Sequence, residues 1–127
     1  MSSTIAAYSG GGLPAAIGIV RLSGDGAAAI ADRLFVPKGE KPFTQRSSNH
    51  LYYGKLLSCE GKTLDLCLAA FYRGPHSYTG ENSVEFQCHG SLAVVDQLFV
   101  ALSTLPDFRP AEPGEFTKRA FLNGKMD

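Results

Sequence analysis

Residues 83–89 read Ser-Val-Glu-Phe-Gln-Cys-His, and polar and apolar side chains alternate along this stretch. Successive side chains of a β-strand point to opposite faces, so the alternation predicts a strand that is buried on one face only. The apolar face would carry Val84, Phe86 and Cys88, and the polar face would carry Glu85, Gln87 and His89. We expect the apolar face of this strand to lie in the core of the domain, with the other elements packed around it.

A helix is expected on either side of this strand in the sequence. After it, Ser91 is a favoured helix N-cap residue, and apolar residues then recur at helical spacing. The expected apolar stripe consists of Leu92, Val95, Leu98, Phe99 and Leu102. The earlier helix would take Asp25 as its N-cap and would end before Pro37. Its expected buried residues are Ala27, Ile30, Ala31 and Leu34.

Four further strands are expected from short runs rich in β-branched and aromatic residues. They lie at residues 4–8, 15–22, 50–57 and 64–72, the last two forming a hairpin around residues 60–62. Loops are expected at 37–49 and 73–82, and a turn-rich tail follows the second helix. The order β-β-α-β-β-β-α predicts an α+β fold, with a mixed or antiparallel sheet backed by two helices.

The composition narrows the possible functions of the chain. The 127 residues hold 12 Lys and Arg against 12 Asp and Glu, and this zero net charge disfavours a main nucleic-acid-binding surface. The three cysteines, an odd number without a C-x-x-C pair, argue against a disulfide framework and a zinc ribbon. No signal peptide or membrane span is recognisable, so a cytoplasmic location is expected.

Arg21 ends a strand face that also carries Ile17 and Ile19. From the spacing alone, the favoured interpretation is a core strand whose terminal arginine reaches solvent. The alternative is a ligand pocket with an apolar floor, in which the permanently charged guanidinium meets a carboxylate or carbonyl group. The residues by themselves leave both interpretations open.

The polar face of residues 83–89 has two similar interpretations. A solvated strand face is the ordinary one, but Glu85, Gln87 and His89 could also form a hydrogen-bonding platform for a flat heterocycle. A metal site at Cys88 and His89 is disfavoured because no second Cys/His pair lies at ligand spacing. The chain contains no G-x-x-x-x-G-K-[ST] loop, so it should not bind or hydrolyse nucleoside triphosphates by itself.

The tail contains the stretch 113–121, Pro-Gly-Glu-Phe-Thr-Lys-Arg-Ala-Phe. A turn at Gly114 followed by a short helix is expected, anchored by Phe116, Ala120 and Phe121. The ordinary interpretation is a surface helix with ion pairs between Glu115 and a basic residue three or four positions later.

Four segments, at residues 17–24, 75–81, 84–90 and 113–127, together resemble one family in both order and spacing. It is the MnmE (TrmE) family of tRNA modification GTPases, at its N-terminal domain. Two departures occur: residues 12–15 read Gly-Leu-Pro-Ala where the family commonly has Gly-Arg-Gly, and Ser91 replaces a glycine. The first departure removes the family's arginine, so a contact made by that side chain is not expected in this chain. The second places a better N-cap residue at the start of the following helix.

The resemblance implies a function that the residues alone do not indicate. Members of the family modify position 5 of the wobble uridine in tRNA together with a flavin-dependent partner of the GidA/MnmG type. Their N-terminal domain is similar to the folate-binding module of the glycine-cleavage T protein; it binds 5-formyltetrahydrofolate or a related one-carbon folate and holds a homodimer together. The full-length proteins also bind GTP, Mg²⁺ and K⁺. Here residues 1–118 would form this domain, and residues 119–127 would begin the connection to a helical domain.

Matching the motifs places the folate-contacting residues of the family on Arg21, Glu85 and Lys125. The inferred roles are that Glu85 accepts the donors on the pterin edge, while Arg21 and Lys125 meet carbonyl or glutamate-tail oxygens. Two other functions are kept as alternatives: a stand-alone folate-dependent aminomethyl- or formyltransferase, and a dimerisation module without a ligand.

Overall fold

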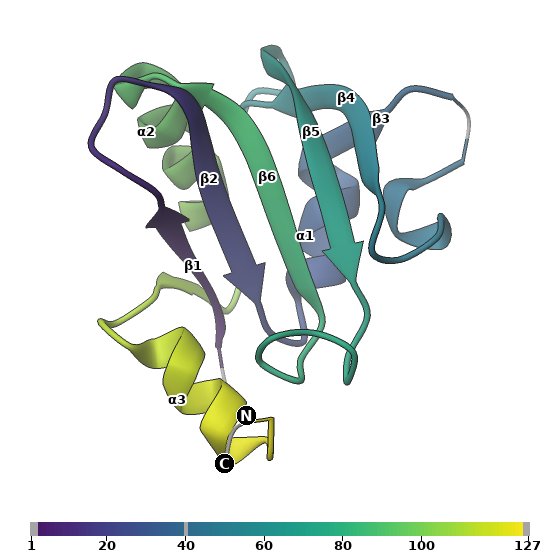
Figure 1. The fold of residues 1–127 in the computed structure, drawn as a ribbon. Helices are drawn as coiled ribbons and strands as arrows, with labels where there is room; N and C mark the ends of the chain where they lie inside the picture. The colour runs from purple at the N-terminus through teal and green to yellow at the C-terminus, as the bar shows by residue number, and fades with distance from the viewer. Residues whose placement is uncertain (1–2, 40, 126–127) are drawn as a thin grey trace.

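The strand expected at residues 83–89 lies near the middle of a seven-stranded sheet in the computed structural model, which describes residues 3–39 and 41–125 (Figure 1). The strands are β1 (Thr4–Ser9), β2 (Ala15–Ser23), β3 (Phe35–Pro37), β4 (Leu51–Leu57), β5 (Thr63–Tyr72), β6 (Ser83–Gly90) and β7 (Phe108–Pro110). The helices are α1 (Ala27–Leu34), α2 (Leu92–Ser103) and α3 (Glu115–Leu122), with a 3-10 turn at Phe43–Gln45. The α+β class is therefore confirmed.

The sheet is mixed, with the strand order β3-β4-β5-β6-β2-β1-β7. All neighbouring strands are antiparallel except β1 and β7, which are parallel. Strand β6 lies between β5 and β2, and its register sets Glu85 opposite Arg21 of β2 and Ala70 of β5. The predicted hairpin at residues 50–72 is confirmed as β4 and β5.

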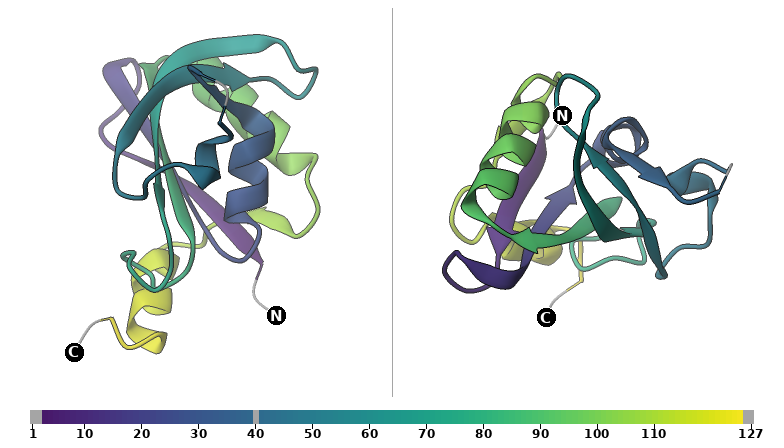
Figure 2. Two further views of the ribbon diagram at one scale, coloured as in Figure 1. Left: turned by 90° about the vertical axis from the view of Figure 1, so that its right-hand side faces the viewer. Right: turned by 90° about the horizontal axis from the view of Figure 1, so that it is seen from above.

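Helices α1 and α2 cover one face of the sheet, and the opposite face is left uncovered by them (Figures 1 and 2). The predicted alternation in β6 is confirmed, because Val84, Phe86 and Cys88 are buried in the core under these helices. The Phe86 side chain is fully buried, and its ring lies 6.1 Å from that of Phe35. Helix α1 buries all four residues expected of it.

The N-cap assignment for α1 is wrong. Gly26, and not Asp25, is the N-cap residue, and its backbone N–H donates to the Thr4 side-chain oxygen at 2.9 Å. A Cβ atom at Gly26 would lie 2.8 Å from the same oxygen. The helix start is therefore fixed by a contact with β1, far away in the sequence, rather than by a local side chain.

Three other parts of the secondary-structure prediction are corrected. Residues 37–49, expected as a loop, contain the 3-10 turn that buries Phe43 with its ring 5.0 Å from that of Phe35. The three-residue edge strand β3 was also missed, since it follows α1 without a break. In α2 the expected stripe is too long by one residue, because Leu92 is 62% exposed.

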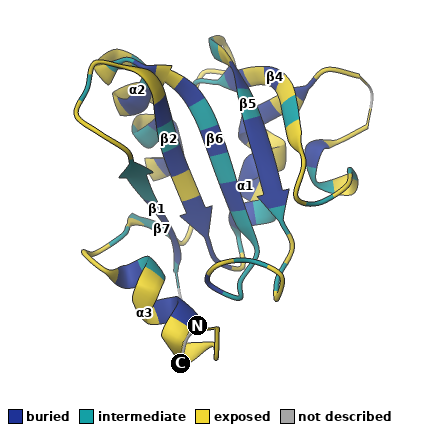
Figure 3. Cartoon of the chain, in the orientation of Figure 1, coloured by how far each residue is buried: buried dark blue, intermediate teal, exposed yellow. Residues whose placement is uncertain are grey.

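Helix α3 lies apart from the other two, at the end of the sheet where β2 ends and β6 begins (Figures 1 and 2). It follows the turn at Gly114, which has the left-handed conformation that glycine readily adopts. Its outer residues are exposed, whereas Glu115, Arg119 and Ala120 are buried (Figure 3). The expected domain boundary at residue 118 falls inside this helix.

No helix in the described part of the chain has the length and apolar character needed to cross a membrane.

Candidate functional site

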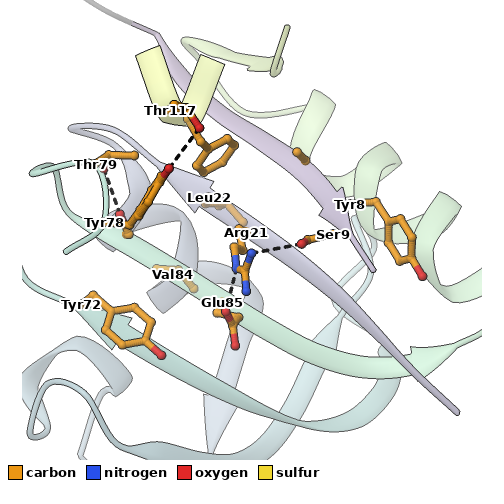
Figure 4. Close-up of a pocket in the computed structure, with 13 residues that line it drawn as sticks. Tyr8, Ser9, Arg21, Leu22, Tyr72, Tyr78, Thr79, Val84, Glu85 and Thr117 are labelled. Carbon is orange, nitrogen blue, oxygen red and sulfur yellow. Dashed lines mark hydrogen bonds and ion pairs between the residues drawn. The ribbon is translucent and has the colours of Figure 1, made fainter. Parts of the chain in front are cut away.

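Arg21 and Glu85 lie side by side on the uncovered face of the sheet. Arg21 Nε donates to Glu85 Oε2 at 2.8 Å, and Arg21 Nη1 donates to Ser9 Oγ at 3.0 Å (Figure 4). The second oxygen of Glu85 accepts a hydrogen bond from Gln87 Nε2, also at 2.8 Å. The expectation that Glu85 and Gln87 share a polar face is confirmed, and the pair is held by residues of three adjacent strands.

The two charges of this pair differ in their exposure to solvent. The Arg21 side chain is 49% exposed, whereas that of Glu85 is only 13% exposed. Burial by itself would raise the pKa of Glu85, but the hydrogen bonds from Arg21 and Gln87 outweigh it, so the pKa is lowered. Glu85 is therefore an anion at neutral pH and can only accept hydrogen bonds.

A cavity of about 540 Å³ lies over the Arg21–Glu85 pair. Its size is in the range of small-molecule sites, and most of its lining is apolar or aromatic. Its walls come from β1, β2, β5, β6, the 73–82 loop and α3; residues not foreseen from the sequence include Tyr8, Tyr72, Tyr78, Phe116 and Thr117. Figure 4 shows Tyr72 and Tyr78 on one side of the ion pair, with Tyr78 bonded to Thr117.

Lys125, the third predicted ligand-binding residue, is not part of the lining of this cavity. Its Nζ donates to the carbonyl oxygen of Pro75 at 3.0 Å, so the side chain is attached to the 73–82 loop. Asn123 strengthens this attachment by donating from Nδ2 to the Thr79 carbonyl at 2.8 Å. The structure thus brings two of the three predicted residues together and places the third on a neighbouring segment.

The position of Tyr72 in the site follows from strand alternation, but only together with the pairing of β5 and β6. Tyr72 lies two residues after Ala70 on β5, and Ala70 pairs with Glu85. Period-two alternation therefore places Tyr72 on the same face as Glu85 once the pairing of β5 with β6 is known. Tyr78 lies in a loop, where no periodicity applies.

Cys88 and His89 point to opposite faces of β6 and do not form a joint metal site. The Cys88 thiol is buried and donates to the Gly18 carbonyl, whereas His89 Nδ1 lies 2.7 Å from Asp65 Oδ1. Burial is also the main cause that raises the pKa of the neighbouring Cys67 to about 12. Within residues 3–39 and 41–125, no group of three or more His, Cys, Asp or Glu side chains is arranged to hold a metal ion.

Comparison with known proteins gives a consistent set of similarities. Residues 4–125 match the family model described as "GTP-binding protein TrmE N-terminus". The chain is similar to the tRNA modification GTPase MnmE of Symbiobacterium thermophilum, with 50% identity over 125 residues, which are 98% of this chain and 27% of that protein. It is also 44% identical to the protein of the same name from Carboxydothermus hydrogenoformans, over all of this chain and 28% of that protein. The protein of that name from Lysinibacillus sphaericus is 45% identical over 98% of this chain and 27% of its own length. The chain thus spans about a quarter of the length of these curated relatives.

Proposed function

The chain belongs to the TrmE N-terminal family, and on that premise we propose that it is the folate-binding and dimer-forming part of a GTPase that modifies the wobble uridine of tRNA. The ligand proposed for the cavity is 5-formyltetrahydrofolate or a related one-carbon folate. The tRNA modification is proposed for the whole protein, in which this chain would supply the one-carbon cofactor.

The observation that supports folate binding is the Arg21–Glu85 pair on the floor of the cavity. A carboxylate has about four acceptor positions, and the bonds from Arg21 and Gln87 occupy two of them. Glu85 can therefore still accept the ring N–H and amino donors on one edge of a pterin. The half-exposed Arg21 can meet a carbonyl oxygen, and the aromatic walls provide apolar surface for the flat ring.

Lys125 enters the proposal as a contact for the glutamate tail. Its ammonium group is held near Pro75, on the loop that also provides Tyr78 and Thr79 to the cavity wall. The bond to the Pro75 carbonyl uses one of the three donors of the ammonium group. Two donors are left for a carboxylate of the tail.

GTP hydrolysis and the action on tRNA are proposed for the full-length protein and not for this chain by itself. These 127 residues contain no phosphate-binding loop, so we assign GTP hydrolysis, with its Mg²⁺ and K⁺, to the part that the relatives have in addition. tRNA and a flavin-dependent partner of the GidA/MnmG type would act with the whole protein in the cytoplasm.

Calorimetric titration of the chain with 5-formyltetrahydrofolate tests the proposal. We expect saturable folate binding at one site per chain, and no binding of GTP at micromolar concentration, because the sequence contains no G-x-x-x-x-G-K-[ST] loop to hold its phosphates. Absence of folate binding, or saturable GTP binding, would contradict the assignment.

We also propose that this domain forms the homodimer. The uncovered sheet face carries Ile17, Leu51, Tyr53 and Leu66, each about half exposed, and a net charge of zero adds no repulsion between copies. Sedimentation equilibrium at tens of micromolar is expected to give twice the mass of the chain. The monomer mass under these conditions would show that the domain does not pair by itself.

A further inference from the structure

Arg119 of α3 is buried between two carboxylates from different parts of the chain. Its Nη2 lies 3.1 Å from Glu115 Oε2 on the same helix, and its Nη1 lies 3.2 Å from Glu81 Oε1 in the 73–82 loop. The same oxygen of Glu81 accepts a hydrogen bond from Ser23 Oγ at 2.7 Å. A continuous chain of polar contacts thus runs from α3 through the loop to the end of β2.

The chain of contacts continues on the other side of α3. Both oxygens of Glu115 accept hydrogen bonds from the guanidinium of Arg109 on β7, and Oε1 also accepts from the Glu112 backbone N–H at 2.9 Å. The hydrogen bond from Arg109 is the main cause that lowers the pKa of Glu115 to about 2. Glu115 is therefore charged at neutral pH and holds the start of α3 on β7.

These ion pairs attach α3 to the 73–82 loop and to β7, alongside the hydrogen bonds that join the loop to the residues just after the helix. The buried residues of the helix are Glu115, Arg119 and Ala120, and two of these three are charged. Of its large apolar side chains, Phe121 and Leu122 are 60% and 68% exposed, and Phe116 is half-buried. Ala120 and Phe116 supply the apolar burial of α3, and charge-assisted hydrogen bonds hold its two buried charged side chains in a defined geometry.

The position of α3 determines one wall of the cavity. Phe116 and Thr117 line it from the helix, and Tyr78 and Thr79 line it from the loop. The two segments meet at the bond of 3.0 Å between the Tyr78 hydroxyl and Thr117 Oγ1. Neither Glu81 nor Arg119 lines the cavity itself, although their ion pair joins the segments that do.

We propose that Glu81 and Arg119 are positioning residues for the cavity, because their ion pair fixes α3 against the 73–82 loop and so sets the wall formed by Tyr78, Phe116 and Thr117. The effect on folate rests on the function proposed above. The effect on the wall is independent of any ligand. Glu81 and Arg119 act only through the residues that they hold.

A single tryptophan provides a readout of the wall without a ligand. The chain has no tryptophan, so Phe116→Trp places one fluorophore on the half-buried wall position. In this background, Glu81→Gln keeps an acceptor oxygen but removes the charge that pairs with Arg119. We expect the tryptophan emission to shift to longer wavelength as the wall opens to water. Amide hydrogen exchange should accelerate roughly tenfold in residues 115–122, which corresponds to a loss of about 1.4 kcal/mol in the free energy of local opening. Exchange in β6 should stay unchanged.

The matched control is Glu60→Gln, which makes the same change in charge at an exposed turn between β4 and β5 and should leave both readouts unchanged. Arg119→Met should change both readouts in the same direction as Glu81→Gln. Arg119→Lys should change them less, because lysine keeps the charge, although it cannot bond both carboxylates in a planar fork. In the chain with the natural Phe116, Glu81→Gln should weaken binding of 5-formyltetrahydrofolate three- to tenfold, within the roughly tenfold range that 1.4 kcal/mol gives.

Unchanged emission and unchanged exchange of α3 in Glu81→Gln would overturn the proposal, whether or not folate binds. If the wall moves and the folate affinity is unchanged, Glu81 and Arg119 attach α3 to the loop but do not position the wall for the ligand, and the positioning role is overturned. If the parent chain does not bind folate, the proposed function fails. The fluorescence and exchange measurements then still decide whether Glu81 and Arg119 set the wall.

Discussion

Glu85→Gln is expected to weaken binding of 5-formyltetrahydrofolate by roughly ten- to a hundredfold. In the proposed complex the carboxylate accepts donors from one pterin edge, and glutamine replaces one acceptor oxygen by an NH2 donor. A buried N–H of the ligand then loses its partner, which costs on the order of 1–3 kcal/mol. At about 1.4 kcal/mol per factor of ten, this corresponds to one to two orders of magnitude in Kd, measured by calorimetry.

The structure changes the expectation for the stability of this variant. If Glu85 faced solvent in the empty site, as the sequence suggested, its replacement would be neutral. The side chain is instead only 13% exposed and paired with Arg21. Because Arg21 is half exposed, we expect Glu85→Gln to lower the free energy of unfolding by less than about 1 kcal/mol. Unchanged folate affinity in Glu85→Gln would mean that Glu85 is only a partner of Arg21 in the sheet.

Phe86→Ala, at the next position of the same strand, is expected to lower the free energy of unfolding by about 3–5 kcal/mol. The side chain is fully buried and packs near Phe35 under α1. Its removal leaves a cavity that its rigid neighbours cannot fill. Urea unfolding followed by circular dichroism measures the loss, which is a large part of the stability of a small domain.

The control for this variant is Leu92→Ala, which removes an apolar side chain that is 62% exposed on α2. A change within about 0.5 kcal/mol is expected there. A loss below about 1 kcal/mol for Phe86→Ala would contradict the assignment of the inner face of β6 to the core.

Local patterns predicted those elements whose structure is determined by one buried face. The alternation in residues 83–89 and the helical spacing of Ala27, Ile30, Ala31 and Leu34 each correspond to contact with a single core. The same patterns failed where a distant contact decides. Gly26 begins α1 because Thr4 accepts its N–H, and Phe43 is buried because its ring packs against Phe35.

Membership in the family was predictable from four motifs and is confirmed by the match over residues 4–125. The candidate site was predictable only in part. The alternation placed Arg21 and Glu85 each on one face of a strand, but the pairing of β2 with β6, which makes them neighbours, depends on sheet order. Strand order is a property of the whole fold, so Tyr72, Tyr78 and Thr117 could not be assigned to the site beforehand.

The contributions of Arg21, Glu85 and Lys125 to folate binding stay predictions, and one measurement tests them together. Titration of the isotopically labelled chain with 5-formyltetrahydrofolate, followed by NMR, reports on each residue of the cavity and on Lys125 beside it. The proposed function predicts that the Arg21 Nε–H resonance and the backbone amides around Glu85 shift in a saturable way with one affinity. Shifts confined to other surfaces, or no shifts at millimolar folate, would contradict it.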